Sequence, residues 1–201
     1  AFYWNATARF TYGAIPATQT VVFGVESAFA TAAPAGANVV GQETTFSRIR
    51  WQSNQAGITP GTYTFQHPYG QDTVVVGANG RAQFTEDIGG AVARDFTGPT
   101  LPASRVTNFL VSTSAPLGKL GDGVTETTVT GGPLRNSVII TGPDGTITVT
   151  NFAVHGRLSP TVAPVASFTT VPVGGTGPQP LSVAFTDTST NGPATWLWNF
   201  G

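Results

Sequence analysis

Short segments rich in β-branched and aromatic residues recur along the chain, each bounded by Gly, Pro, Asn or Asp. About one residue in six is Thr, and 25 Gly and 15 Pro interrupt the sequence frequently. This pattern favours strands joined by tight turns. We predict ten strands, at residues 18–25, 45–51, 61–66, 73–76, 81–85, 106–112, 124–130, 137–141, 146–150 and 152–158. Their close spacing predicts an all-β fold, an antiparallel β-sandwich of Ig-like or jelly-roll-like type.

Helical segments are hard to find in this sequence. The best candidate is residues 26–37, but it contains Pro34 and Gly36 and has no apolar stripe at a spacing of about 3.6 residues. We therefore predict a loop there.

Two turns are predicted from their residues. Asp144-Gly145, preceded by Gly142-Pro143, lies between two β-branched runs, and Ala78-Asn79-Gly80 is placed in the same way. Asp-Gly and Asn-Gly pairs accept the positive φ angles of tight hairpin turns. Each turn is therefore expected to close a hairpin between the strands on either side of it.

Alternation within residues 45–51 separates two faces. Phe46, Arg48 and Arg50 share one face, whereas Ile49 and Trp51 lie on the other. The second face is the one expected to enter the core.

The composition changes at residues 159–164, where Pro160 and Pro164 bracket small residues. Such a stretch is typical of an extended, fairly stiff linker. We therefore predict a β-sandwich domain at residues 1–158, a Pro-rich linker at 159–164 and a second, partial domain at 165–201.

The second domain carries motifs in a specific order. A strand at 165–169 is followed by a Gly/Pro loop, by Phe185-Thr186-Asp187-Thr188-Ser189 and by Trp198-Asn199-Phe200-Gly201. This order resembles the PKD (polycystic kidney disease) domain, whose last motif usually has Asp where this chain has Asn199. The resemblance covers the final fifth of the chain. It implies an Ig-like sandwich of a surface or secreted protein.

The same segment shows alternating apolar faces. They are expected to form the core of this module or a junction between subunits, through Leu181, Val183, Phe185, Trp196, Trp198 and Phe200. PKD domains continue for roughly as many residues again, so the expected sandwich is incomplete. Three explanations stay open: the native chain continues, another copy supplies the missing strands by β-strand addition, or the sequence has been shortened.

The first domain has a weaker resemblance. Residues 61–70, 84–89 and 120–123 look like parts of a module found in large uncharacterised secreted bacterial proteins. This resemblance implies an extracellular location and no particular activity.

Composition excludes several classes of function. Charged residues make up 9% of the chain and the net charge is −1, so no basic field exists to bind nucleic acid. The absence of Cys excludes disulfides and thiolate metal sites within this sequence. No apolar run approaches the roughly 18 to 20 residues that span a bilayer. Since the sequence starts at Ala1 rather than Met, we expect a chain processed for secretion.

A search for catalytic patterns leaves few candidates. His67 and His155 are the two histidines, and both are expected to be strand residues because no nucleophile motif accompanies them. Glu86 and Asp87 are the one adjacent carboxylate pair, but neighbours on a strand point to opposite faces, and we predict a turn there. Asp122 supplies too few oxygens for calcium. The sequence therefore predicts no catalytic residue, no cofactor and no metal ligand.

Two features near the N-terminus concern the surface. Asn5-Ala6-Thr7 is an N-x-T sequon, which makes Asn5 a candidate glycosylation site. The aromatic run Phe2-Tyr3-Trp4 is costly to leave in water and is expected to pack against the domain or a neighbouring subunit.

These observations favour a non-enzymatic, extracellular structural protein of a prokaryotic cell surface. Low charge reduces repulsion between copies, so a homo-oligomer, filament or other polymer joined through β-edges is the expected assembly. The alternative is an accessory module of a secreted degradative enzyme, with surface glycans or a protein as its partner. A direct enzymatic activity is the third hypothesis.

Overall fold

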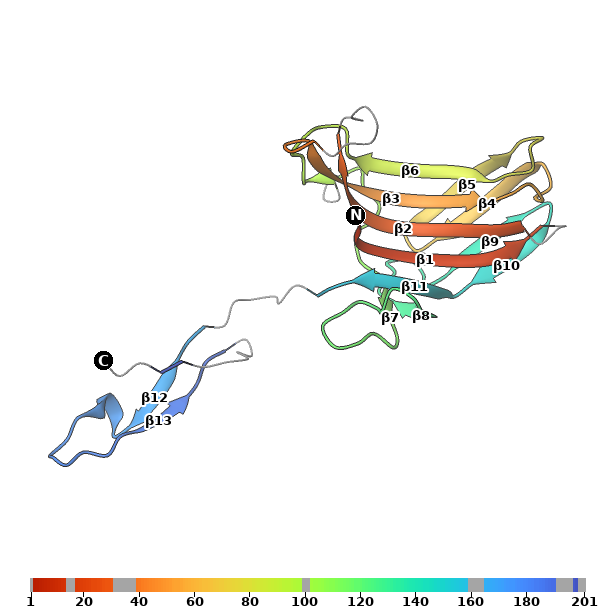
Figure 1. The fold of residues 1–201 in the computed structure, drawn as a ribbon. Helices are drawn as coiled ribbons and strands as arrows, with labels where there is room; N and C mark the ends of the chain where they lie inside the picture. Colours follow the sequence, from red (N-terminus) through yellow and green to blue (C-terminus); the bar gives the residue numbers. More distant parts are fainter. Residues whose placement is uncertain are drawn as a thin grey trace. The chain divides into compact units, whose positions relative to one another are not determined.

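The computed structural model describes residues 2–13, 17–30, 39–98, 102–158, 165–190 and 197–198. Tertiary contacts divide the chain into two units, Ala1–Leu158 and Ser159–Gly201. The described residues form strands, turns and one short 3-10 helix, with no α-helix among them. The prediction of an all-β fold with antiparallel sheets is therefore confirmed (Figure 1).

The first unit contains a seven-stranded sheet, sheet A, with the spatial order β6-β3-β2-β1-β11-β8-β7. Every pair of neighbouring strands in it is antiparallel. Its strands are β1 (Phe2–Tyr12), β2 (Ala17–Phe29), β3 (Glu43–Ser53), β6 (Gln83–Gly89), β7 (Val111–Ser112), β8 (Glu126–Thr130) and β11 (Asn151–Gly156).

A four-stranded antiparallel sheet, sheet B, lies behind sheet A in Figure 1. Its spatial order is β10-β9-β4-β5. Its strands are β4 (Gly61–His67), β5 (Gly70–Val76), β9 (Val138–Gly142) and β10 (Gly145–Val149). The two sheets make the first unit a β-sandwich.

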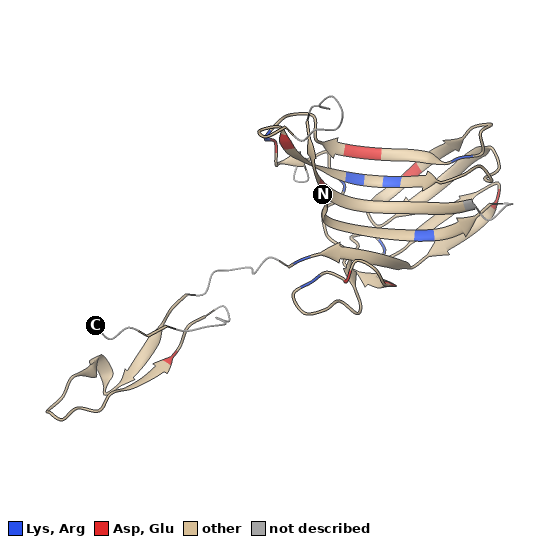
Figure 2. Cartoon of the chain, in the orientation of Figure 1, with Lys and Arg blue, Asp and Glu red and all other residues tan. Residues whose placement is uncertain are grey.

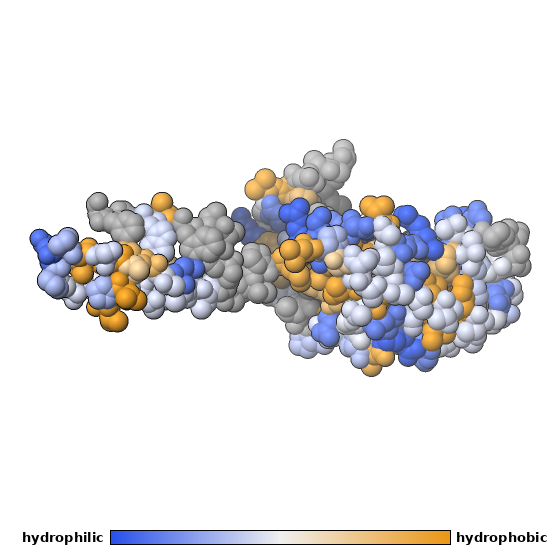
Figure 3. All heavy atoms as spheres, turned by 90° about the horizontal axis from the view of Figure 1, so that it is seen from below, coloured by the Kyte–Doolittle hydropathy of each residue, from blue (hydrophilic) through white to orange (hydrophobic). Residues whose placement is uncertain are grey.

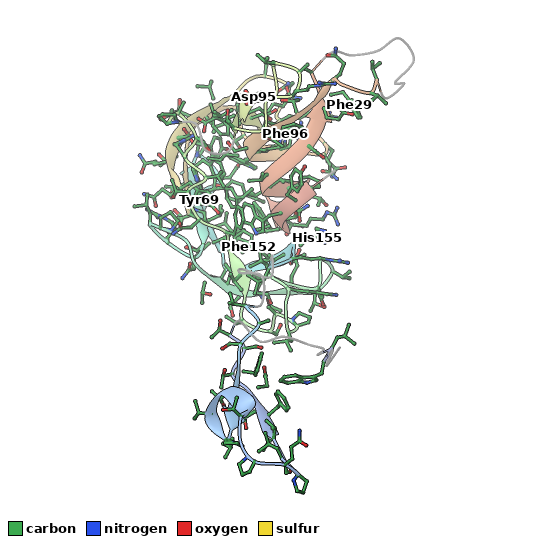
Figure 4. The ribbon with its side chains drawn as sticks, turned by 90° about the vertical axis from the view of Figure 1, so that its left-hand side faces the viewer. Phe29, Tyr69, Asp95, Phe96, Phe152 and His155 are labelled. Carbon is green, nitrogen blue, oxygen red and sulfur yellow. The ribbon has the colours of Figure 1, made fainter. Side chains whose placement is uncertain are left out.

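The core lies between the inward faces of the two sheets. Sheet A contributes alternate residues of β1, β2, β3 and β11, and sheet B contributes those of β4, β5 and β9. In the end-on view of Figure 4, Tyr69 and Phe152 lie within this interior. The largest fully buried apolar side chains are Trp4, Trp51, Tyr63, Phe23, Phe65 and Phe152. The prediction that Ile49 and Trp51 face the core is confirmed.

Strand β1 was not predicted from the sequence, although it pairs with both β2 and β11 near the middle of sheet A. Its aromatic run packs on the domain itself. The Trp4 indole is fully buried and donates a hydrogen bond of 3.1 Å to the Leu110 carbonyl, and the Phe2 ring lies over Gly24. Tyr3, between them, is 58% exposed.

The predicted hairpin at Ala78-Asn79-Gly80 is wrong, although a tight turn forms there through a hydrogen bond from the Gly80 amide to the Gly77 carbonyl. β5 pairs with β4 in sheet B, whereas β6 pairs with β3 in sheet A. The chain after the turn is held by the end of β3, because the Ser53 amide donates to the Ala82 carbonyl and the Ser53 hydroxyl accepts from the Ala82 amide. The turn therefore carries the chain from one sheet to the other.

Other local predictions differ in their outcome. The hairpin at residues 142–145 is confirmed, since β9 and β10 pair on either side of it. The strand predicted at 106–112 is reduced to Val111–Ser112. The loop predicted at 26–37 is wrong in its first part, where β2 continues to Phe29, and residues 31–37 lie outside the described part of the chain.

The second unit contains one two-stranded antiparallel sheet among its described residues. It consists of β12 (Phe168–Val171) and β13 (Ala184–Asp187), and the 3-10 helix η3 (Val173–Gly175) follows β12. An isolated bridge between Val165 and Thr190 extends the pairing.

The hairpin at 142–145 supports a test of the fold. A Cβ at Gly142 would overlap the ring of Tyr63, whose hydroxyl lies 2.6 Å from Asp144 Oδ2 and 2.8 Å from the Thr59 carbonyl oxygen. We expect Gly142→Ala to lower the free energy of unfolding by about 1–3 kcal/mol, the usual cost of overpacking. Urea denaturation of the variant measures this loss. Thr148→Ala, at an exposed position of β10, is the control, and an equal effect of the two substitutions would contradict the packing described.

Candidate functional site

Three aromatic rings gather on one side of the two-stranded sheet. Phe168 comes from β12, Phe185 from β13, and Trp198 from the chain after them. Their ring centroids lie 5.9 Å apart for Phe168 and Phe185, 5.6 Å for Phe168 and Trp198, and 5.8 Å for Phe185 and Trp198. These are distances of direct aromatic contact. We call Phe168, Phe185 and Trp198 the aromatic trio.

The trio remains accessible to solvent. Phe168 is 56% exposed, Phe185 41% and Trp198 39%. Aromatic residues that pack together in a complete domain are usually covered by a second layer of side chains. The trio is therefore an open apolar face.

The predicted core residues of this module fall into three groups. Phe185 and Trp198 meet in the trio. Leu181 and Val183 precede β13 rather than belonging to it, because that strand begins at Ala184. Trp196 and Phe200 lie outside the described residues. Phe168 was missing from the predicted set, although alternation along the expected strand at 165–169 could have drawn attention to it.

A polar cluster fixes the ladder beside the trio. The Ser189 hydroxyl donates to Asp187 Oδ1 at 2.6 Å, and the Ser189 amide donates to the same oxygen at 3.0 Å. The Ser167 amide donates to the Ser189 hydroxyl oxygen at 3.2 Å. These bonds tie the start of the first strand segment to the end of the second, and they engage Asp187, which is the only charged residue between Ser159 and Gly201.

The distribution of charge and apolar surface sets the second unit apart from the sandwich. Figure 2 shows acidic and basic positions over the strands of sheet A and a single acidic position on β13. Figure 3 shows apolar atoms on the visible face of the second unit. Its exposed large apolar side chains include Val165, Phe168, Val171, Val173, Leu181, Phe185, Leu197 and Trp198.

In the sandwich, His67 at the end of β4 is fully buried, as expected for a packed strand residue. The Tyr69 amide donates to His67 Nδ1 at 3.2 Å, so the ring proton lies on Nε2, which faces Asp72 Oδ2 at 2.9 Å. Both ring nitrogens are therefore occupied by protein partners. Burial lowers the pKa of His67 to about 4, which keeps the ring neutral near pH 7.

Arg105 joins the edges of the two sheets beside His67. Its guanidinium lies 3.0 Å from Asp72 Oδ2 on β5 and 2.7 Å from Glu86 Oε2 on β6. The predicted turn at Glu86 and Asp87 is wrong, because both residues belong to β6. The two side chains point to opposite faces of the strand, as expected. Glu86 pairs with Arg105, whereas Asp87 pairs with Arg48 of β3. The cluster of His67, Asp72, Glu86 and Arg105 thus closes one side of the sandwich.

The remaining candidate residues lie on the surface. His155 is exposed on β11 and lies apart from Tyr69 in Figure 4. Asp122 accepts hydrogen bonds from the Thr125 hydroxyl and from the amides of Val124 and Thr125, and the hydroxyl contact above all lowers its pKa to about 2. Asn5 lies half-buried in the middle of β1. Its glycosylation stays a prediction.

Two further kinds of site are absent from the described residues. No three His, Cys, Asp or Glu side chains there are placed to hold a metal ion together. No helix in that part of the chain has the length and apolar character needed to cross a bilayer.

Comparisons of the chain with models of protein families, with curated proteins and with solved structures find no match.

The burial of His67 predicts a dependence of stability on pH. Between pH 6.5 and about 4 the unfolded chain takes up a proton on this residue while the folded protein does not. The contribution of His67 to stability is therefore complete above pH 6.5 and is lost as the pH falls toward 4. We expect a loss of about 3 kcal/mol across this window, since each pKa unit corresponds to about 1.4 kcal/mol.

Urea denaturation of the sandwich between pH 7.5 and pH 4 measures this dependence. His67→Gln removes the titrating imidazole but keeps a polar side chain, so it is the matched control for every effect of pH that does not come from His67. The account requires a steeper fall in the unaltered protein than in His67→Gln. Equal slopes would show that His67 does not titrate in this way.

Proposed function

We propose that this protein is an extracellular structural protein of a cell surface, whose copies assemble through the β-strands and the aromatic trio of the second unit. The exposure of three mutually packed aromatic rings on a nearly uncharged two-stranded sheet carries this proposal. Two strands rarely form a stable structure in water without further strands or a covering layer. Pairing with another copy provides both.

The strand edges of the two units differ in their protection. In the sandwich, the edge strand β5 carries Asp72, and the edge strand β6 carries Glu86 and Asp87, whereas the other two edge strands, β7 and β10, carry no charged residue. Charged side chains on edge strands oppose pairing with another chain. β12 has no charged residue, and β13 has Asp187 alone, which hydrogen-bonds to Ser189. β12 is therefore an uncharged strand that lies beside the aromatic trio, and this combination favours it as the site of β-strand addition.

The aromatic trio provides an apolar contact surface beside strands β12 and β13. Exposed, clustered aromatic side chains typically provide most of the binding energy of protein interfaces. With one charged residue in the whole second unit, two copies approach each other with little electrostatic repulsion. The resemblance of the same segment to PKD domains supports the extracellular location and an Ig-like arrangement of the completed module.

Assembly is tested by sedimentation and by electron microscopy of the full chain, without denaturant, over a range of concentrations. We expect ordered polymers built from subunits of 20.7 kDa. Trp198→Ala removes one ring of the trio and is expected to weaken association at least about tenfold, as for a typical interface hot spot. A chain that stays monomeric at every concentration would contradict the proposal.

A pair of matched variants locates the interface. Val171→Lys places a charge on β12, where the native side chain is 69% exposed, and Val75→Lys places one on β5, where it is 72% exposed. Both substitutions change an exposed valine of an edge strand, so they have similar effects on folding and net charge. We expect Val171→Lys to abolish assembly and Val75→Lys to leave it intact. The reverse result would place the interface on the sandwich.

A further inference from the structure

A polar groove of about 270 Å³ lies on the outer face of sheet A, on the side away from sheet B. It crosses β1, β11 and β8 and is bordered by the loop before β8. Its lining includes the side chains of Asn5, Thr7, Arg9, Val124, Glu126 and Ala153. None of these residues belongs to the second unit, so the groove is separate from the assembly surface proposed above.

The groove exists because a small residue, Ala153, lies on β11, which is the middle one of the three strands that the groove crosses. The register pairs Thr7 of β1 with Ala153 of β11, and Ala153 with Glu126 of β8. All three side chains point outward, since the alternate residues Phe152 and Val154 of β11 are buried. The Ala153 methyl group therefore leaves a hollow between its two larger neighbours.

One wall of the groove is a tightly held loop. The Asp122 carboxylate accepts hydrogen bonds of 2.9 Å from the Val124 amide and 2.8 Å from the Thr125 amide. The Gly123 amide donates to the Val154 carbonyl at 2.8 Å. The wall is thus fixed in place before any ligand binds, which lowers the entropic cost of binding.

The lining combines hydrogen-bond donors and acceptors. Arg9, the single basic position on β1 in Figure 2, supplies guanidinium N–H groups and forms no ion pair with a described residue. Glu126 supplies carboxylate oxygens, of which Oε1 accepts the Arg9 amide at 3.2 Å. Asn5 offers both a donor and an acceptor, and Thr7 a hydroxyl.

We propose that this groove binds a neutral, hydroxyl-rich ligand, namely a saccharide unit. Its lining carries one cation and one anion, which disfavours a phosphate, a carboxylate or an ammonium group. Vicinal hydroxyls can donate to Glu126 while accepting from Arg9 and Asn5, in charge-assisted hydrogen bonds. The volume lies just below the roughly 300–1,000 Å³ of pockets for drug-sized ligands, which suits one or two sugar rings.

Saturation-transfer NMR with the unglycosylated full chain tests the proposal. The probes are N-acetylglucosamine, mannose, lactose and maltose at millimolar concentration, with glucuronate and glucose 6-phosphate as charged counterparts. We expect transfer to at least one neutral sugar and weaker transfer to the charged ones. Transfer to none of the neutral sugars, or stronger binding of the charged probes, would overturn the proposal.

Two variants place the binding in the groove. Ala153→Leu fills the hollow from a solvent-facing position, and Glu126→Gln removes the anionic acceptor while keeping its shape. Each is expected to weaken sugar binding by about tenfold or more. Ala153→Leu takes up the space of the ligand, and Glu126→Gln removes a charge-assisted hydrogen bond. Gln52→Leu, at an exposed position of β3 on the same sheet, is the control and should bind as the unaltered chain does. Equal binding by all three variants would rule out this groove as the site.

Discussion

The packing of aromatic side chains between two sheets holds the first unit together, and the other features depend on it. Trp51 from sheet A packs against Tyr63 and Phe65 from sheet B, and Trp4 and Phe23 from sheet A pack against Tyr69 in the turn between β4 and β5. All of these side chains are buried. Burying each such side chain contributes a few kcal/mol. This core holds the strands of sheet A in register, and the register places Ala153 between Thr7 and Glu126 at the groove on the outer face. It also explains why His67 is neutral, since the ring is embedded among the same aromatic residues.

The second unit also brings aromatic side chains together, but they are less deeply buried. Phe168, Phe185 and Trp198 make ring contacts like those of the sandwich core, but each is exposed to a large extent. The sandwich has carboxylates on two of its four edge strands, β5 and β6, and Arg105 joins those two strands. In the second unit, β12 carries no charged residue. This contrast between fully buried and partly exposed aromatic rings in one chain is the physical basis for the proposed assembly.

Local patterns in the sequence predicted the strands better than their partners. The Asp144-Gly145 turn closes a hairpin, whereas Asn79-Gly80 connects two sheets, because Ser53 holds the following segment through hydrogen bonds that no local pattern indicates. β1 escaped prediction because Asn5, Thr7 and Arg9 alternate with the small residues Ala6 and Ala8 rather than with large apolar ones. The groove could not be foreseen either, since it depends on the register of Ala153 between Thr7 and Glu126.

Amide hydrogen exchange tests most directly whether another copy completes the second unit. The rates of residues 168–171 and 184–187 are compared between dilute, monomeric protein and concentrated, assembled protein, with the amides of β1, β2 and β3 as an internal reference. We expect the reference amides to be protected in both samples and those of β12 and β13 to become protected only on assembly. Equal exchange of β12 and β13 in the two samples, whether fast or slow, would contradict completion by a second copy.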